Sequence, residues 1–273
     1  MSGESMRPVS QGAGALAHER QVPPLGGFNL VALSLEIRRV LRNKRTLWFI
    51  VAFPSIFFFI FRQSSSRAAA AGGGAPSASM MAYLLISMAV YGAMVGTTSG
   101  GAAVALERSL GWSRQLRLTP LRPAAYVAMK VLTAMSLGGL AIISAFTVGA
   151  LSGVQMEPRV WILSGLAAWG CSLVFAAFGL FMGFLLPSEN VMQFVGPVLA
   201  LMAMFGGIFI PIATMPPTMQ TVAKFTPVYG VGVLARAPLV GGDTGTAVLG
   251  VVVWTLLFAL GAALLFRRDT ARV

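Results

Sequence analysis

The stretch ERSLGWSRQLRLTPLRPAAYVAMK, residues 107–130, is an island of charge between two long apolar runs. Its charged side chains are Glu107, Arg108, Arg114, Arg117, Arg122 and Lys130. The runs on either side, residues 80–106 and 131–151, contain no charged residue at all. Such a contrast indicates two surroundings, water around the charged stretch and lipid around its neighbours. We therefore interpret residues 107–130 as a loop at one face of a membrane.

The composition of the whole chain is that of a membrane protein. Hydrophobic residues make up 56% of the 273 residues and charged residues only 10%, and the mean hydropathy is +0.80. A formal net charge of +12 would suit a nucleic-acid-binding protein. The basic residues instead occupy short segments between apolar runs, which is where membrane proteins carry them. We therefore expect membrane lipids, and no nucleic acid, as partners.

Six apolar runs predict an all-α polytopic membrane protein with six transmembrane helices. They cover about residues 46–62, 80–106, 125–151, 161–186, 191–210 and 246–266. Together with the segment before them they predict one transmembrane domain, residues 27–266. Residues 1–26, rich in Gly, Pro, Ser and Gln, predict a disordered tail, and residues 267–273 a second tail.

Residues 28–45 have the spacing of an amphipathic helix. Its apolar face holds Leu30, Leu33, Ile37, Val40 and Leu41, and its polar face holds Glu36, Arg38, Arg39 and Arg42. An ordinary helix of a soluble core would show the same periodicity. Because a spanning run follows at once, we expect this helix to lie in the membrane interface with its cations near anionic headgroups.

Residues 211–243 are broken by prolines and cannot form one continuous spanning helix. Two short helices are predicted instead, at residues 217–225 and 228–235, as a re-entrant pair at one membrane face. The residues expected to form a gate there are Pro211, Met215, Pro216, Pro227 and Tyr229.

The distribution of Lys and Arg predicts the orientation. With six spans both termini share a side, and that side with residues 107–130 holds 15 basic residues against five on the other. The five are Arg62, Arg67, Arg159, Lys224 and Arg236. We therefore expect a multi-pass protein of the cell membrane with both termini in the cytoplasm and the proline-broken segment facing outward.

Gly92, Gly96 and Gly100 fall on one face of the second span. A face of small residues lets two helices approach closely. Glycine is also simply common in membrane helices, and the face could equally line a pore. The sequence leaves these alternatives open.

The motifs of several enzyme classes are missing. The sequence has no nucleotide-binding loop, no HExxH and no GxSxG. No ionisable residue lies deep within a predicted span, which argues against a proton-coupled pump. The chain is therefore expected to be a non-enzymatic subunit that takes its energy from another protein.

The charged loop is similar to a known motif. Glu107, Arg108, Gly111, Leu116, Thr119 and Pro120 form E-R-x-x-G-x-x-x-x-L-x-x-T-P. This pattern resembles the coupling segment of the ABC-2 family of export permeases, which docks on a partner ATPase. The basic amphipathic segment, the six spans and the proline-rich segment with MPP and TPVYG extend the resemblance over residues 28–266. Trp112 departs from the Thr or Ser that family members often have there.

The resemblance implies partners and roles. A cytoplasmic ABC ATPase would carry ATP and Mg, no cofactor would bind this chain, and a second permease would complete a dimeric pore. Glu107 would pair with a basic residue of the amphipathic helix such as Arg38 or Arg42, and Gly111 would allow a turn. Arg114 and Arg117 would face acidic or carbonyl groups of the ATPase. A basic loop that only sets topology is the alternative.

The resemblance also favours a hydrophobic drug, an antibiotic or a lipid-like product as the exported substrate. Candidate path residues are Phe178, Met202 and Phe205, because aromatic and methionine side chains bind such molecules without strict geometry. Export of a polysaccharide or lipid-linked glycan is one alternative. A membrane enzyme acting on lipids through Glu157 and Asp243, or a scaffold subunit, are others.

Overall fold

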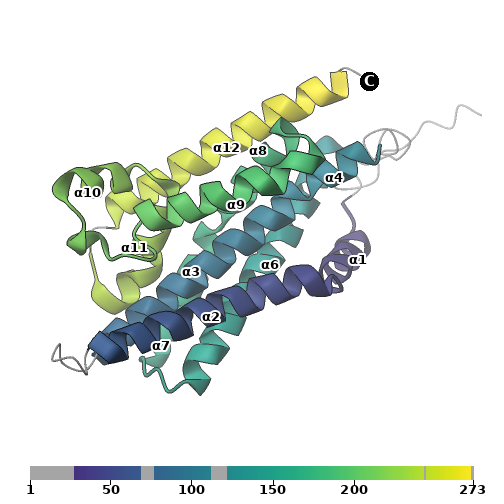
Figure 1. Ribbon diagram of the computed structural model, residues 1–273. Helices are drawn as coiled ribbons and strands as arrows, with labels where there is room; N and C mark the ends of the chain where they lie inside the picture. Colours follow the sequence, from purple (N-terminus) through teal and green to yellow (C-terminus); the bar gives the residue numbers. More distant parts are fainter. Residues whose placement is uncertain (1–27, 69–76, 112–121, 243, 272–273) are drawn as a thin grey trace, which may run out of the picture.

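The structure, a computed structural model, describes residues 28–68, 77–111, 122–242 and 244–271 (Figure 1). Over these residues it is all-helical, without a strand, and the predicted all-α class is confirmed. Six helical segments are long and apolar enough to cross a membrane. They are Leu47–Ser64, Ala78–Ser109, Ala124–Leu151, Pro158–Leu185, Ser188–Phe205 and Gly245–Arg268. The predicted number of six spans is therefore confirmed within the described chain.

The helices follow one another with short connections. Their bounds are α1 Leu30–Leu41, α2 Lys44–Ala68, α3 Ala78–Ala102, α4 Val104–Ser109, α6 Pro123–Leu151, α7 Pro158–Cys171, α8 Leu173–Leu185, α9 Ser188–Phe205, η4 Ile212–Thr214, α10 Pro217–Lys224, α11 Pro227–Val240 and α12 Gly245–Ala271. Proline is the first residue of α6, α7, α10 and α11, where its missing N–H costs nothing. The fourth span is interrupted at Ser172, between α7 and α8.

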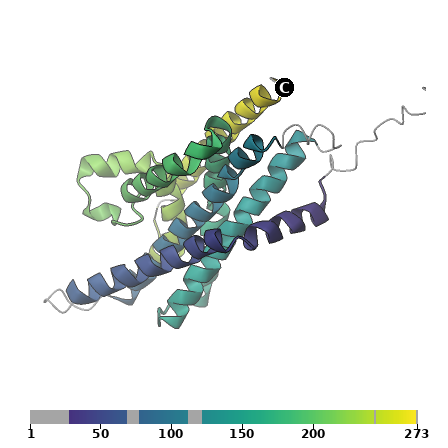
Figure 2. The ribbon, with the colours of Figure 1, turned by 45° about the vertical axis from the view of Figure 1, so that its right-hand side comes forward.

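The helix α3 runs through the middle of the bundle (Figure 1), and it contacts α2, α6, α7, α8, α9 and α11. Nearly all of its residues from Ala82 to Ala102 are buried. The helices α1 and α4 and the end of α12 lie at one end of the bundle, and α10 lies at the other, as Figures 1 and 2 both show. The bundle thus has two ends with different structures.

The glycine face of α3 is a packing interface. A Cβ built on Gly96 would lie 3.1 Å from the carbonyl oxygen of Leu137 on α6, and one on Gly100 would lie 2.7 Å from Cα of Ala134. On the neighbouring face, a Cβ on Gly101 would lie 2.6 Å from the carbonyl oxygen of Ala176 on α8. These backbones touch because small residues leave no side chain between them. Gly96 and Gly100 thus follow the close-packing alternative, whereas Gly92 contacts Pro54 on α2 and also lines a groove between α2, α3 and α9.

The segment after α9 folds into the two short helices that its prolines predict, α10 from Pro217 and α11 from Pro227. The expectation that the second helix ends at residue 235 is wrong. The helix continues through Pro238, which sacrifices one backbone hydrogen bond, and ends at Gly241 with a positive φ of 70°. Whether the pair re-enters a membrane stays a prediction.

Candidate coupling site

A buried ion-pair network joins three helices at the α1 end of the bundle. Lys130 on α6 places its Nζ atom 2.5 Å from Glu107 Oε1 on α4 and 2.5 Å from Glu36 Oε1 on α1. The Glu107 and Lys130 side chains are only 6% and 8% exposed. Charges taken this far out of water are stable only when they are paired. Lys130 therefore links α6, on which it lies, to α1 and α4 through its two ion pairs.

Two further side chains complete this group. Tyr126 donates its hydroxyl to Glu107 Oε2 at 2.7 Å. Arg39 Nη1 lies 3.7 Å from Glu107 Oε1 and 3.5 Å from Glu36 Oε2. The five residues Glu36, Arg39, Glu107, Tyr126 and Lys130, here called the charge cluster, hold two carboxylates and two cations and have no formal net charge. Such balance lets a polar group persist inside a bundle.

Helical spacing brings the cluster together. Tyr126 and Lys130 are four residues apart on α6, and Glu36 and Arg39 are three apart on α1, so each pair shares a face. Glu107 pairs with the amphipathic helix, as predicted, but it does so through Arg39 and not through Arg38 or Arg42. Arg38 is rotated by about 100° from Arg39 around the helix, and Arg42 lies beyond the last residue of α1.

Arg108 fixes α4 to a second helix. Its Nη1 atom donates to the carbonyl oxygens of Gly183 and Phe184, each at 3.0 Å, and the guanidinium lies 5.8 Å from the centre of the Phe184 ring. These carbonyls belong to the last turn of α8, where intrahelical donors run out and a positive charge is favourable. Glu107 and Arg108 therefore attach α4 to α6 and α8 at the same time.

Gly111 turns the chain directly after α4. Its φ is +75°, a left-handed conformation that side chains other than glycine rarely adopt, and its N–H donates to the carbonyl of Arg108. A Cβ there would meet nothing, so the backbone angle and not a lack of space requires glycine. Arg114, Leu116, Arg117, Thr119 and Pro120 lie outside the described residues, and their contact with an ATPase stays a prediction.

Arg108→Ala is expected to lower the stability of the permease by about 1.5–3 kcal/mol, because hydrogen bonds to charged groups are worth about that much and the α8 carbonyls lose their donor. We expect a lower midpoint for loss of the monodisperse peak when detergent-solubilised protein is heated. The matched control is Arg159→Ala, an exposed arginine at the start of α7. Equal midpoints for the two variants would contradict the assigned role of Arg108.

The predicted gate residues lie at the helix ends of the opposite end of the bundle. Pro211 and Met215 flank η4, Pro216 precedes α10, Pro227 begins α11, and Tyr229 lies in the first turn of α11. The predicted path residues lie on α8 and α9. Phe178 is buried against Phe258, Met202 packs against the core, and Phe205 is the last residue of α9. Their roles in gating and transport stay predictions.

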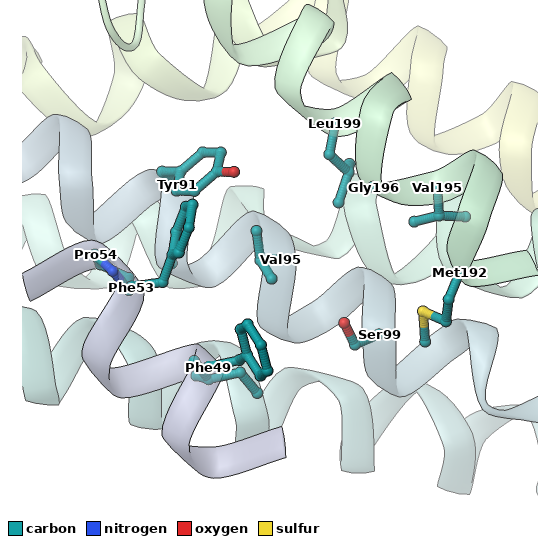
Figure 3. Close-up of a pocket in the computed structure, with 12 residues that line it drawn as sticks. Phe49, Phe53, Pro54, Tyr91, Val95, Ser99, Met192, Val195, Gly196 and Leu199 are labelled. Atoms are coloured by element: carbon teal, nitrogen blue, oxygen red, sulfur yellow. The ribbon is translucent and has the colours of Figure 1, made fainter. Parts of the chain in front are cut away.

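A groove of about 610 Å³ lies between α2, α3 and α9 (Figure 3). Its lining is mostly apolar and includes Phe49, Phe53, Tyr91, Val95, Ser99 and Met192. None of the three predicted path residues is in that lining. The groove is here called the α2–α3–α9 groove.

Sequence reasoning missed two features of the site. Lys130 was counted only as a loop charge, although Tyr126 four residues before it is a signal for a polar face on α6. Arg236 was counted as an exposed outward charge, whereas its side chain is buried on α11. Nothing in the local sequence distinguishes Arg236 from an exposed arginine, because the groups that surround it come from distant segments.

Six apolar helical segments, one of them containing the central α3, with charged groups at the ends of the bundle, define a multi-pass helical membrane protein. The chain belongs to the ABC-2 type transporter family, whose profile matches residues 30–239. It is also similar to the putative transport permease YvfS of Bacillus subtilis (strain 168). The two are 28% identical over 239 residues, which cover 86% of this chain and 96% of that protein. The chain is therefore a membrane permease of an ABC transporter, a transport subunit rather than an enzyme.

The family match runs from α1 to α11 and so includes every described member of the charge cluster and the α2–α3–α9 groove. ABC-2 permeases normally work with an ATPase and a second permease.

Proposed function

We propose that this chain is one half of the pore of an ATP-driven exporter, assembled from two permease chains and a separate cytoplasmic ATPase that binds ATP and Mg. The observation that carries the proposal is the double attachment of α4. Glu107 ties it to α6 and α1, and Arg108 ties it to α8. A push on the segment that follows α4 would therefore move three helices rather than one.

The packing of the helices indicates how a displacement of α4 would reach the α2–α3–α9 groove. The helices α6 and α8 both pack on α3 through close backbone contacts at glycine. A tightly packed interface transmits displacement because it has little free volume to absorb it. Since α3 forms one wall of the α2–α3–α9 groove, movement of α4 with α6 and α8 would change the width of the groove.

The groove supports a hydrophobic or amphipathic substrate, such as a drug, an antibiotic or a lipid-like product. Its wall is built of aromatic, aliphatic and methionine side chains, with few polar groups such as Ser99 and the Tyr91 hydroxyl. Such linings suit apolar ligands of varied shape. A polysaccharide or lipid-linked glycan would need many more hydrogen-bonding groups than this wall offers, so glycan export is the weaker alternative.

The helices beside the groove support pairing with a second permease chain. Each buries one narrow stripe, Ile50, Pro54 and Phe58 on α2 and Val191, Val195, Leu199 and Ala203 on α9. Large apolar side chains such as Trp48, Phe49 and Met192 remain exposed on them. A second copy or a related chain across this face would enclose the groove between two subunits, with lipid covering what remains.

An aromatic cluster supports a closed outward gate. Phe209, just beyond α9, has its ring centre 5.0 Å from that of Tyr91, 5.7 Å from that of Phe57 and 6.2 Å from that of Phe61. Tyr91 also lines the groove, so the aromatic cluster adjoins it. The predicted gate residues from Pro211 to Tyr229 lie directly after Phe209 in the chain.

The orientation and the position of α1 belong to the same proposal. Apolar Leu30, Val31 and Leu35 are exposed on α1, which suits a helix lying in the membrane interface. The start of α1 and the end of α12 lie at the same end of the bundle (Figure 1), as expected if both termini are cytoplasmic. That end also carries the charge cluster, and the opposite end would face outward.

The test of this function uses tagged protein purified in mild detergent from its native host. An ABC ATPase is expected to co-purify, and ATP hydrolysis in nanodiscs should rise when a transported drug or lipid is added. Val95→Trp fills the groove and should reduce that stimulation about tenfold, which is the loss expected when roughly 1.4 kcal/mol of binding is removed. The control Leu260→Trp places the same ring on an exposed position of α12.

Absence of an ATP-binding partner in the purified complex would overturn the proposal. Equal stimulation in the Val95 and Leu260 variants would leave the exporter standing but move its substrate path away from the α2–α3–α9 groove. Both results are read from the same preparation, so loss of the partner and loss of the path are distinguished.

A further inference from the structure

A buried arginine occupies the end of the bundle opposite the charge cluster. Arg236 on α11 is only 3% exposed. Its Nη1 atom donates to Ser87 Oγ at 2.9 Å and to the Gly207 carbonyl at 3.4 Å, and the guanidinium carbon lies 4.6 Å from the centre of the Tyr83 ring. The coupling mechanism gives this side chain no part, so its burial needs another explanation.

The charge of Arg236 is not neutralised by the part of the chain that the structure describes. Its partners there are a hydroxyl, a carbonyl and an aromatic face, and none of the ion pairs among the described residues includes it. Burying a cation without an anion is costly, and proteins rarely do so unless a ligand supplies the anion. The environment of Arg236 therefore suits a negatively charged partner.

The guanidinium also has unused donors. Both of its hydrogen bonds leave from Nη1, and within the described residues Nε and Nη2 make none. Among the described residues, Ser164 Oγ is the only buried side-chain nitrogen or oxygen without a hydrogen-bond partner. Nε and Nη2 of Arg236 are therefore not fully enclosed. Both nitrogens thus keep some exposed surface, and Arg236 is among the residues that line a neighbouring cavity. Two adjacent guanidinium donors match the two oxygens of a phosphate or carboxylate.

That cavity has a volume of about 730 Å³ and lies between α3, α10, α11 and the start of α12. Its polar lining residues include Arg236, Lys224, Tyr83 and Tyr229, and no carboxylate is among the described residues that line it. Its apolar lining residues include Ile212 and Phe225. The lining thus offers both cationic groups for an anion and apolar groups for a hydrocarbon chain within a single cavity.

The position of the guanidinium depends on Gly232. A side chain on a helix points back toward the N-terminus, so Arg236 folds over the residue four positions before it. A Cβ on Gly232 would lie 2.8 Å from Nη2 and 3.3 Å from the guanidinium carbon. Gly232→Ala would therefore displace the charged group while keeping the charge, and this gives a variant that tests geometry alone.

We propose that this cavity binds the anionic head, a phosphate or a carboxylate, of an amphipathic molecule whose apolar part lies against Phe225 and Ile212. The nitrogens Nε and Nη2 of Arg236 donate to the head group, and Lys224 at the mouth of the cavity attracts it. The inference does not rest on the export function, because a membrane lipid would satisfy the same chemistry as a transported amphiphile. A free inorganic anion is the other source with that chemistry.

The experiment measures lipid retained by the full-length permease in native mass spectrometry after exchange into mixed micelles of phosphatidylglycerol and phosphatidylcholine. Wild-type protein is expected to retain phosphatidylglycerol preferentially, and Arg236→Gln should reduce that preference roughly tenfold, since a charge-assisted bidentate contact is lost. Gly232→Ala should reduce it less, and Lys224→Gln by a few-fold. The control Arg159→Gln removes an exposed cation outside the cavity and should change nothing.

A second arm titrates the same variants with inorganic phosphate and follows its binding by calorimetry. Phosphate binding that depends on Arg236, with no lipid preference in wild-type protein, would support the anion site and assign it to a free anion. If folded Arg236→Gln retains anionic lipid and phosphate as wild-type protein does, the proposal is overturned, and Arg236 serves only to hold α11 against α3. If Arg236→Gln does not fold, the test rests on the other two variants. The proposal is then overturned if Gly232→Ala and Lys224→Gln both retain the wild-type preference for anionic lipid.

Discussion

Glu107→Ala is expected to abolish the substrate-stimulated ATP hydrolysis of the assembled transporter. The carboxylate is buried and accepts the Tyr126 hydroxyl while it pairs with Lys130, so it holds α4 in place from inside the permease. Removing it leaves Lys130 buried with Glu36 as its remaining carboxylate, and breaking a buried pair in this way costs about 3–5 kcal/mol. The expected loss thus combines lower stability with loss of coupling. ATPase activity in nanodiscs and thermal stability in detergent are the two measurements.

A double substitution separates these two effects. When both members of a buried pair are replaced by apolar residues of similar size, stability is often recovered, because no unpaired charge is left. Glu107→Met with Lys130→Met should therefore regain most of the stability lost in the single variant. It should not regain stimulated hydrolysis, since α4 has lost its tie to α6. Wild-type stimulation in the stable double variant would contradict the coupling role of the charge cluster.

The exposed arginines of α1 provide the matched control. Arg38, Arg39 and Arg42 are all exposed, but among the described residues only Arg39 forms ion pairs with the carboxylates of the cluster. Exposed ion pairs and charges contribute little to the free energy of unfolding, typically below about 1 kcal/mol. Arg38→Ala and Arg42→Ala should leave stability nearly unchanged, whereas Arg39→Ala should weaken the cluster slightly because its partner Glu107 is buried. Identical results for all three arginines would show that the pairing with Arg39 has no consequence.

The sequence was sufficient to predict the features that depend on local chemistry. Apolar runs predicted six spans, prolines predicted two short helices after α9, and Gly111 itself predicted a turn. Each of these follows from the length of a run or from the backbone preference of one residue. They require no knowledge of which helices are neighbours.

The contacts between distant segments could not be predicted in the same way. Glu36 and Lys130 are 94 positions apart, and Arg236 and Ser87 are 149 apart. Pairing of Glu107 with Arg39 rather than Arg38 depends on how α1 is rotated against α4 and α6, which periodicity does not fix. Arg236 was misplaced for a related reason. The residues around an arginine in the sequence do not show whether its side chain is exposed in a loop or buried. For Arg236 this is decided by the packing of α11 on α3.

Gly101→Val is expected to prevent stable folding of the bundle. A Cβ at this position lies 2.6 Å from the carbonyl oxygen of Ala176 and 2.7 Å from the amide nitrogen of Leu180, both backbone atoms of α8 that no rotamer change can move. Overpacking a core typically costs about 1–3 kcal/mol, and here two central helices would have to separate, so we expect the upper end of that range or more. The measurement is the yield of monodisperse permease and its thermal midpoint in detergent.

Gly170→Ala is the control for that substitution, because a Cβ on this α7 residue meets nothing within 4 Å. It should fold with nearly wild-type stability, whereas Gly101→Ala should already be weakened by the contact with α8. Since α8 carries the carbonyls that Arg108 binds, separating α3 from α8 should also reduce coupled ATP hydrolysis in any protein that survives purification. Full stability of Gly101→Val would mean that α3 and α8 do not pack through their backbones, and the proposed route from α4 to the α2–α3–α9 groove would fail with it.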